Sequence, residues 1–251
     1  MPSDGPVILT GAASGIGRAT AQALAAKPHA LALVDINAEL LNQVVGICQR
    51  TSAQTRGFTC DVTDQAAVTR SWQQIRHEFG SAAILINCAG IGRFAPFLEI
   101  EPTEWLRMFN VNVMGAVLFT RAVLPDMLAA GKGLIINVSS RMALDPHPTT
   151  TAYAASKAAI HAFSKALAME VKVHGVKVTF LAPGGTKNQY RHAKTRRLSR
   201  TKRNCGCDRL HHGEQREECV GARSSGPAAR VLRTRRIVPP SGGSPEVAEL
   251  R

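Results

Sequence analysis

Residues 6–24 read PVILTGAASGIGRATAQAL: a short apolar run, a glycine-rich turn and then a helical pattern. Glycines at such a turn allow positive φ and let a diphosphate approach the backbone, while the helix N-terminus offers unpaired N–H groups and a favourable dipole. A glycine-rich turn alone fits an ordinary tight turn as well as a cofactor loop. The order strand, loop, helix nevertheless makes this turn a candidate dinucleotide site.

A second buried-looking strand, residues 30–34, ends at Asp35. This carboxylate stands about 20 positions beyond the glycine loop, where a dinucleotide fold holds the ribose 2′-hydroxyl. A carboxylate there accepts from the hydroxyls of NAD and repels the 2′-phosphate of NADP. No Lys or Arg immediately follows Asp35, and Ser14 inside the loop is uncharged. We therefore expect NAD rather than NADP, the alternative being a solvated carboxylate at a strand end.

Six short strand-like segments, several of them continuous apolar runs, alternate with long segments of helical spacing, which predicts a parallel sheet covered on both faces. The expected strands are residues 6–9, 30–34, 56–60, 83–87, 134–138 and 176–180. We predict a single-domain α/β fold, a Rossmann-like doubly wound parallel sheet, with ligand at the carboxyl ends of its strands.

Tyr153 and Lys157 are four residues apart, so one face of a helix would hold the phenol and the amine together. At ~5 Å and an effective dielectric of ~20 the ammonium would stabilise a phenolate by roughly 3 kcal/mol, or about two pKa units. Such a pair can exchange protons near neutral pH. Taken alone, the pair also fits an exposed lysine and a half-buried tyrosine on an amphipathic helix.

Taken together, these motifs resemble those of the short-chain dehydrogenases/reductases, from residue 6 to about residue 185. The resemblance is carried by the glycine loop, Cys60-Asp61-Val62, Asn87-Cys88-Ala89-Gly90, Asn112, Ser140 and Tyr153-x3-Lys157. These six motifs stand in the family's order and at its spacing. The resemblance implies an NAD(P)-dependent alcohol dehydrogenase or carbonyl reductase.

The resemblance also implies a role for each catalytic residue. Tyr153 would exchange the hydroxyl proton while a hydride passes between the nicotinamide and the substrate carbon. Ser140 would hydrogen-bond the substrate oxygen, which leaves its neighbour Ser139 a structural role. Lys157 would hold the nicotinamide ribose and lower the phenol pKa. Asn112 would anchor a water that relays protons from the lysine.

The cofactor-binding residues implied by the resemblance follow the ends of the strands. Asp61 and Val62 would contact the adenine, and Ile16 would meet the diphosphate through its backbone N–H. Cys88 departs from the family's usual second Asn, with a small expected effect. The full set is Gly11, Ser14, Gly15, Ile16, Gly17, Asp35, Asp61, Val62, Asn87, Ala89, Gly90, Tyr153, Lys157, Pro183 and Gly184.

The substrate cannot be identified from the sequence beyond its class. Gly92-Arg93-Phe94 and residues 141–148 should border the pocket, and their Met, Leu, Phe and Pro side chains indicate a moderately apolar alcohol or ketone. Arg93 fits a solvated loop arginine better than a carboxylate-binding group.

Beyond residue 185 the family pattern stops. Residues 188–251 hold 15 of the 31 Lys and Arg residues but 6 of the 18 acidic ones, so this segment carries +9 of the net +13. Its apolar residues keep no helical or strand period, which predicts poor order. We divide the chain into a dinucleotide-binding domain, 1–187, and a basic tail, 188–251, in place of the usual substrate lid, last helix and last strand.

Three explanations for the tail remain open: a reading-frame change near residue 187, a genuine disordered extension, or a basic module that binds an anionic partner. The first is favoured, and we expect no nucleic-acid partner because no aromatic or groove-reading motif accompanies the arginines. The tail's Cys and His residues lack zinc-ligand spacing, so no metal is expected.

The N-terminus enters a strand directly, and no apolar run is long enough to cross a membrane. We expect a cytoplasmic protein with reduced cysteines and no membrane partner. A homo-oligomer is typical of the family, although the tail puts it in doubt. The alternative function is a catalytically impaired dinucleotide-binding protein, or a truncated or frameshifted product of such a gene.

Overall fold

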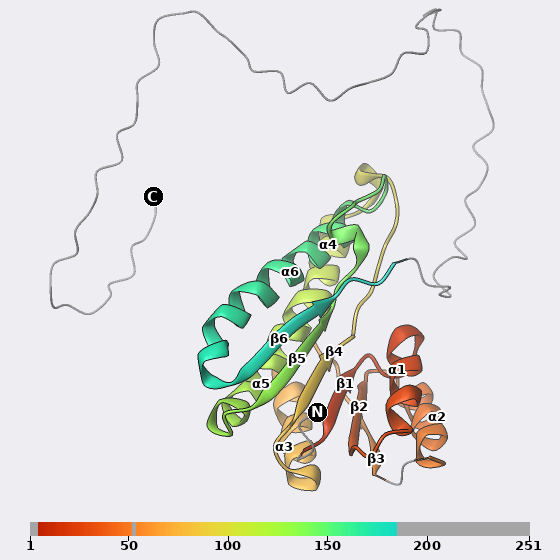
Figure 1. The fold of residues 1–251 in the computed structure, drawn as a ribbon. Helices are drawn as coiled ribbons and strands as arrows, with labels where there is room; N and C mark the ends of the chain where they lie inside the picture. The colour runs from red at the N-terminus through yellow and green to blue at the C-terminus, as the bar shows by residue number, and fades with distance from the viewer. Residues whose placement is uncertain (1–4, 52–53, 185–251) are drawn as a thin grey trace, which may run out of the picture. The chain divides into compact units, whose positions relative to one another are not determined.

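The computed structural model describes residues 5–51 and 54–184 of the 251-residue chain. Six parallel strands form one sheet in the order β3-β2-β1-β4-β5-β6 (Figure 1). The strands are β1 Val7–Thr10, β2 Leu31–Asp35, β3 Thr55–Thr59, β4 Ile84–Asn87, β5 Gly133–Val138 and β6 Val176–Leu181. The predicted doubly wound α/β fold is confirmed, and each strand's ends fall within one residue of the expected ones.

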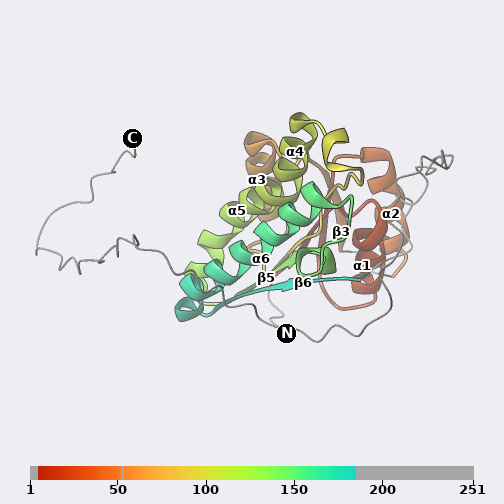
Figure 2. The same ribbon diagram turned by 90° about the horizontal axis from the view of Figure 1, so that it is seen from above.

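Helices connect the strands and cover both faces of the sheet. They are α1 Gly15–Ala25, α2 Ala38–Gln49, α3 Gln65–Phe79, α4 Pro102–Phe109, α5 Gly115–Ala129 and α6 Thr151–Val171. Seen from above, α3, α4, α5 and α6 lie on one side of the sheet, and α1 and α2 lie near its β1–β3 half (Figure 2). Alternate residues of β1 supply the two cores, since Ile8 packs with Phe119 and Val123 of α5 while Leu9 packs with Ala21 of α1.

The strand order reverses between β1 and β4, the two central strands. Their register pairs Thr10 with Asn87, so both strands reach the same level at the carboxyl edge. A doubly wound sheet binds its ligands in the crevice beyond such a switch point, because the connections on either side diverge to opposite faces. The glycine loop after β1 and residues 88–90 after β4 therefore face each other there.

The helical stretch Pro102–Ala129 is long and apolar enough, by composition alone, to cross a membrane. It comprises α4, a π-helical turn Asn110–Met114 and α5. Phe119, Val123 and Met127 of this stretch are buried in the core of the α/β sheet. Packing in the core accounts for the part of this stretch that is buried.

β6 is the edge strand of the sheet within the described residues. Lys177, Thr179 and Leu181 are exposed, whereas Val178 packs against the core and Phe180 stacks on His161 of α6. The predicted basic tail, residues 188–251, lies outside the described residues.

Candidate active site

The glycine loop is built from close backbone contacts that side chains would prevent. Gly11 has φ +67°, and a Cβ there would lie 2.7 Å from the Cα and N of Ala89. A Cβ on Gly17 would overlap the carbonyl oxygen of Gly11. The loop can therefore lie tightly between the start of α1 and the end of β4. The first N–H groups of α1, from Gly15 onward, have no intrahelical acceptor and suit a diphosphate.

Asp35 holds the end of β2 against this loop. Its Oδ2 accepts from the N–H of Ala13 and its Oδ1 from the N–H of Asn37, both at 2.9 Å. These two bonds fix the carboxylate beside the glycine loop. Ser14, which follows Ala13 at the start of α1, is exposed. The position is the one from which a carboxylate can meet a ribose 2′-hydroxyl.

Thr10 joins the two central strands at their carboxyl ends. Its Oγ1 accepts from the N–H groups of Cys88 and Ala89 at 3.1 and 3.2 Å. Asp61, after β3, accepts from the N–H and hydroxyl of Thr63, both at 2.8 Å. The Val62 side chain is buried in the core, so this structure leaves mainly its backbone for the predicted adenine contact.

Asn87 is placed differently from a side chain that faces a cofactor. It is 5% exposed, and its Nδ2 donates to Oδ1 of Asn137 at 2.8 Å and to the hydroxyl of Thr120 at 3.3 Å. Asn137 in turn donates to Ser164, whose hydroxyl donates to the carbonyl of Ile160. The amide nitrogen of Asn87 thus belongs to a buried chain that ties β4, β5 and α6, whereas its Oδ1 is buried without a hydrogen-bond partner among the described residues.

Lys157 is buried on α6, with 4% of its surface exposed, and its Nζ donates to the carbonyl of Val138 at 2.9 Å. Burial lowers the pKa of Lys157 from 10.5 to about 8, because the ammonium loses solvation. Burial also raises the pKa of the nearby Cys88 thiol to about 11. That thiol is therefore neutral over the range in which Lys157 titrates and provides no counter-charge.

Tyr153 lies one turn before Lys157, as the spacing predicts. The Nζ of Lys157 is 5.9 Å from the centroid of the half-buried Tyr153 ring. Phe94 packs edge-on against the same ring, with centroids 5.3 Å apart. A Cβ on Gly92 would lie 3.2 Å from Cδ2 of Tyr153, so a glycine there lets the backbone pass close to the phenol ring.

Asn112 occupies the π-helical turn between α4 and α5 and is 2% exposed. Its Oδ1 accepts from the N–H of Ile91 at 2.8 Å, and its Nδ2 donates to the carbonyl of Ile91 at 3.0 Å and to the hydroxyl of Ser156 at 2.9 Å. Ser156 donates to the carbonyl of Tyr153 at 2.8 Å. The amide therefore clamps the segment after β4 to α6, which leaves its backbone as the group that could anchor a water.

The two serines after β5 have different environments. Ser139 is buried, and its hydroxyl donates to the carbonyl of Lys157 at 2.9 Å. Ser140 is half-buried, and its hydroxyl accepts from the N–H of Met142 at 3.2 Å. The Ser140 hydroxyl thus keeps its proton and a lone pair for a substrate oxygen. The carbonyl of Pro183 accepts from the N–H of Arg141 at 3.0 Å, which places Pro183 beside this turn.

Gly90 lies close to two of the predicted catalytic residues. A Cβ on Gly90 would lie 3.2 Å from Oδ1 of Asn112 and 3.2 Å from Nζ of Lys157. Gly184, at the end of the described chain, has no atom within 4 Å of such a position. The predicted residues thus follow the carboxyl ends of the strands, and the side chains of Val62, Asn87, Asn112 and Lys157 are buried.

Sequence reasoning missed three buried polar residues of this region: Ser156, Asn137 and Ser164. Asn137 interrupts an otherwise apolar strand, and Ser164 stands two turns after Lys157 on one helix face. These two positions were the features of the sequence that could have indicated buried polar contacts. Ser156 gives no comparable signal, because its role depends on contact with the distant Asn112.

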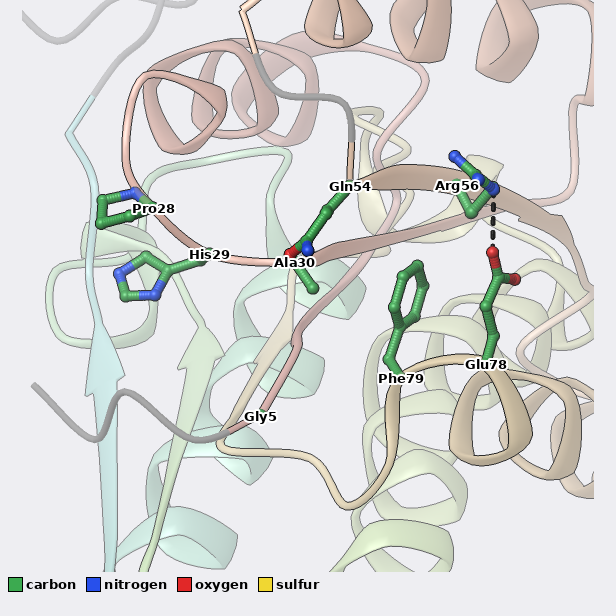
Figure 3. Close-up of a pocket in the computed structure, with 8 residues that line it drawn as sticks. All are labelled: Gly5, Pro28, His29, Ala30, Gln54, Arg56, Glu78 and Phe79. Atoms are coloured by element: carbon green, nitrogen blue, oxygen red, sulfur yellow. Dashed lines mark ion pairs between the residues drawn. The ribbon is translucent and has the colours of Figure 1, made fainter.

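A cavity of about 460 Å³ lies at the opposite, amino-terminal edge of β1, β2 and β3 (Figure 3). The ion pair of Arg56 and Glu78 at 2.8 Å and the ring of Phe79 line one side, and His29 lies across from them. None of the predicted site residues lines this cavity. It is remote from the candidate catalytic groups.

Comparisons with known proteins agree with this geometry. A sequence model described as short chain dehydrogenase matches residues 6–199. D-threitol dehydrogenase of Mycolicibacterium smegmatis is 41% identical over 184 residues, 72% of this chain and 70% of that one. A 2,3-dihydro-2,3-dihydroxybenzoate dehydrogenase of Bacillus subtilis is 35% identical over 71% of this chain and 68% of its own.

Two solved structures share the fold. One is an NAD+-bound xylitol dehydrogenase, with a TM-score of 0.70 and 32% identity over 72% of this chain and 70% of that chain. The other is a 3-ketoacyl-(acyl-carrier-protein) reductase from Brucella melitensis complexed with NADH, with a TM-score of 0.71 and 29% identity over 75% and 78%.

Proposed function

The chain belongs to the short chain dehydrogenase family of oxidoreductases, and from that premise we propose that it transfers a hydride between NAD(H) and the carbinol or carbonyl carbon of an alcohol or ketone. The buried ammonium of Lys157, 5.9 Å from the Tyr153 ring, is the observation that carries the proposal. Burying this cation costs stability, and among the described residues only the Val138 carbonyl accepts a hydrogen bond from it. A buried charge that structure alone does not require supports a role in catalysis.

The residues at the carboxyl edge fit a nicotinamide dinucleotide. The backbone of Gly11, Gly17 and Ala89 is packed so closely that a side chain at either glycine would overlap it. The ammonium of Lys157 has two further protons for ribose hydroxyls. A bound dinucleotide would accept the hydride from an alcohol, or donate one to a ketone.

The protein side of the reaction is proton transfer and orientation. In alcohol oxidation, the phenolate of Tyr153 takes the hydroxyl proton as the carbon–oxygen double bond forms, and Ser140 holds the substrate oxygen. The Lys157 charge, with its Nζ 5.9 Å from the ring centroid, favours that phenolate. In reduction, the neutral phenol returns the proton.

We propose NAD in preference to NADP. Asp35 supports this choice because two backbone N–H groups fix its carboxylate beside the glycine loop. A 2′-phosphate there would meet the fixed negative charge, whereas a 2′-hydroxyl could donate to it. We also propose that the chain consists of a dinucleotide-binding domain, residues 1–187, and a basic tail, residues 188–251. We further propose that the enzyme is cytoplasmic and homo-oligomeric.

Tyr153→Phe tests the proposal. The variant keeps the aromatic ring against Phe94 and removes only the proton-transferring oxygen, so NADH binding, followed by fluorescence titration, should stay within about twofold of the parent. Turnover of secondary alcohols with NAD should fall at least 10²-fold, the usual contribution of general acid–base catalysis. Parent-like turnover by the variant would refute the mechanism. A parent protein that binds NADH but oxidises no alcohol would be the catalytically impaired binding protein instead.

A further inference from the structure

Phe94 is an exposed aromatic side chain held against the proposed catalytic tyrosine. Its ring meets Tyr153 at 5.3 Å and an interplanar angle of 67°, yet 45% of the residue remains exposed. A Cβ on Gly92 would lie 3.3 Å from Cζ of Phe94 and 3.2 Å from Cδ2 of Tyr153. The two rings therefore meet over the Gly92 backbone, with part of the Phe94 ring left open to a ligand.

The segment that carries Phe94 is fixed at both ends. The amide of Asn112 binds both backbone groups of Ile91. At the other end, the N–H of Ala95 donates to the carbonyl of Thr149 at 3.0 Å, in the loop that precedes α6. Phe94 is thus a preformed wall rather than a side chain on a free loop, and its order costs a ligand little.

The polar side chain next to Phe94 is directed to another partner. Arg93 forms an ion pair with Glu104 of α4, with Nε and Oε1 3.1 Å apart. This surface contact, with both side chains partly exposed, directs the guanidinium toward α4. On the far side of Ser140, Leu144 follows in the next turn and is 69% exposed.

We propose that Phe94 determines specificity at this site, selecting a secondary alcohol or ketone whose reacting carbon belongs to an apolar ring over a linear polyol. The inference rests on the proposed function and adds the substrate class. A ring placed at Tyr153 would cover the exposed part of Phe94 and bury apolar surface against it. A polyol would place hydroxyls against that ring without hydrogen-bond partners, which costs affinity.

The test uses the full chain with NAD and three probe alcohols: cyclohexanol, propan-2-ol and D-threitol. We expect kcat/KM to be highest for cyclohexanol and lowest for D-threitol. Phe94→Ala should raise KM for cyclohexanol about tenfold with little change in kcat, and should leave propan-2-ol unaffected. Phe94→Leu keeps an apolar wall and should restore most of the cyclohexanol KM.

Phe97→Ala is the matched control. Phe97 is also an exposed aromatic residue, 61% exposed, but it packs on Trp105 at 6.2 Å rather than on Tyr153. Its removal should leave the KM of all three probes unchanged. An equal fall in kcat for every probe in Phe94→Ala would mean that Phe94 only orients Tyr153, and would overturn the specificity role.

A binding measurement separates this inference from the proposed function. In the Tyr153→Phe variant saturated with NADH, cyclohexanone should bind without reacting, and adding Phe94→Ala should weaken its binding about tenfold. If the parent turns over no alcohol but this pattern holds, the proposed function fails and the ring site stands. If D-threitol is the best substrate, or cyclohexanone does not bind, the ring site is overturned.

Discussion

The glycine loop and the Tyr153–Lys157 helix lie at the same edge of the sheet but are built in opposite ways. The loop depends on missing side chains, since a Cβ at Gly11 or Gly17 would meet backbone atoms directly. The helix depends on buried polar contacts, since Asn112 donates to Ser156 and Lys157 donates to the carbonyl of Val138. A cofactor site made of backbone tolerates no added atom, whereas a catalytic site made of side chains is sensitive to each lost partner.

The largest effect is expected from filling the loop. Gly17→Ala would place a methyl group on the carbonyl oxygen of Gly11, where backbone must move for it to fit. We expect NADH affinity to fall more than about 100-fold and unfolding free energy by about 1–3 kcal/mol, as for other overpacked sites. Fluorescence titration and urea unfolding measure both.

Gly46→Ala is the control for that change. Gly46 lies within α2, and a Cβ there would meet no atom within 4 Å. The variant should gain about 0.5–1 kcal/mol of stability from helix propensity, with NADH affinity unchanged. Equal effects of the two alanines would show that the loop is not the site of tight backbone contact.

Removing the buried cation should separate activity from stability. Lys157→Met should lower kcat by about 10²-fold or more, because the phenolate of Tyr153 loses its nearby charge. The unfolding free energy near pH 7 should not fall with kcat, because the substitution also removes a buried charge. Lys165→Met, at an exposed position on α6, is the control and should alter neither.

The same lysine gives a pH dependence of known sign. Its pKa is about 8 in the folded protein and 10.5 as a reference for the unfolded chain, so the unfolded state binds more protons between these values. The parent's stability should therefore rise from about pH 8 to pH 10.5, by up to about 3 kcal/mol. Below pH 8 Lys157 is protonated in the folded protein, so burial of its charge lowers the unfolding free energy by the full amount. A parallel rise in Lys157→Met, seen in unfolding curves across this range, would contradict the assignment.

A smaller effect is expected at the ribose end of the loop. Asp35→Asn removes the negative charge and keeps a side-chain oxygen for the N–H groups of Ala13 or Asn37. The ratio of NADPH to NADH affinity should rise about tenfold, and parallel titrations measure it. An unchanged ratio would mean that Asp35 only supports the loop.

The smallest effect tests the side-chain clamp. Ser156→Ala removes the bridge between the amide of Asn112 and the carbonyl of Tyr153, so kcat should fall a few-fold and the pH profile of kcat should shift. Ser164→Ala removes another buried serine of α6, one bound to Asn137. Both variants should cost about 1–3 kcal/mol of stability, but Ser164→Ala should not move the pH profile. Identical pH profiles in both variants would assign Ser156 a structural role only.

The sequence predicted the backbone-built half of the site more completely than the side-chain-built half. Glycine spacing after an apolar run is local information, and it placed the loop and Asp35 where the structure has them. The proximity of Tyr153 and Lys157 also followed from helix spacing. The inward turn of Asn87 did not, because it depends on Asn137, fifty positions away along the chain.

Arg93 is a second residue whose contacts could not be predicted from the local sequence. Its place after the cofactor platform indicated a solvated loop residue, and half of its side chain is indeed exposed. Its pairing with Glu104 depends on how α4 returns over the loop, which no local pattern encodes. Tertiary contacts therefore decide which of the nearby polar groups remain available to a substrate.

Cys88 gives the site an unexpected chemical robustness. With a pKa raised to about 11, roughly one such thiol in ten thousand is ionised at neutral pH, and the thiolate is the form that alkylating agents and peroxide attack. A cysteine beside the cofactor platform would ordinarily make an enzyme vulnerable to oxidants. Here, burial that keeps the sulfur neutral should protect the platform from covalent damage.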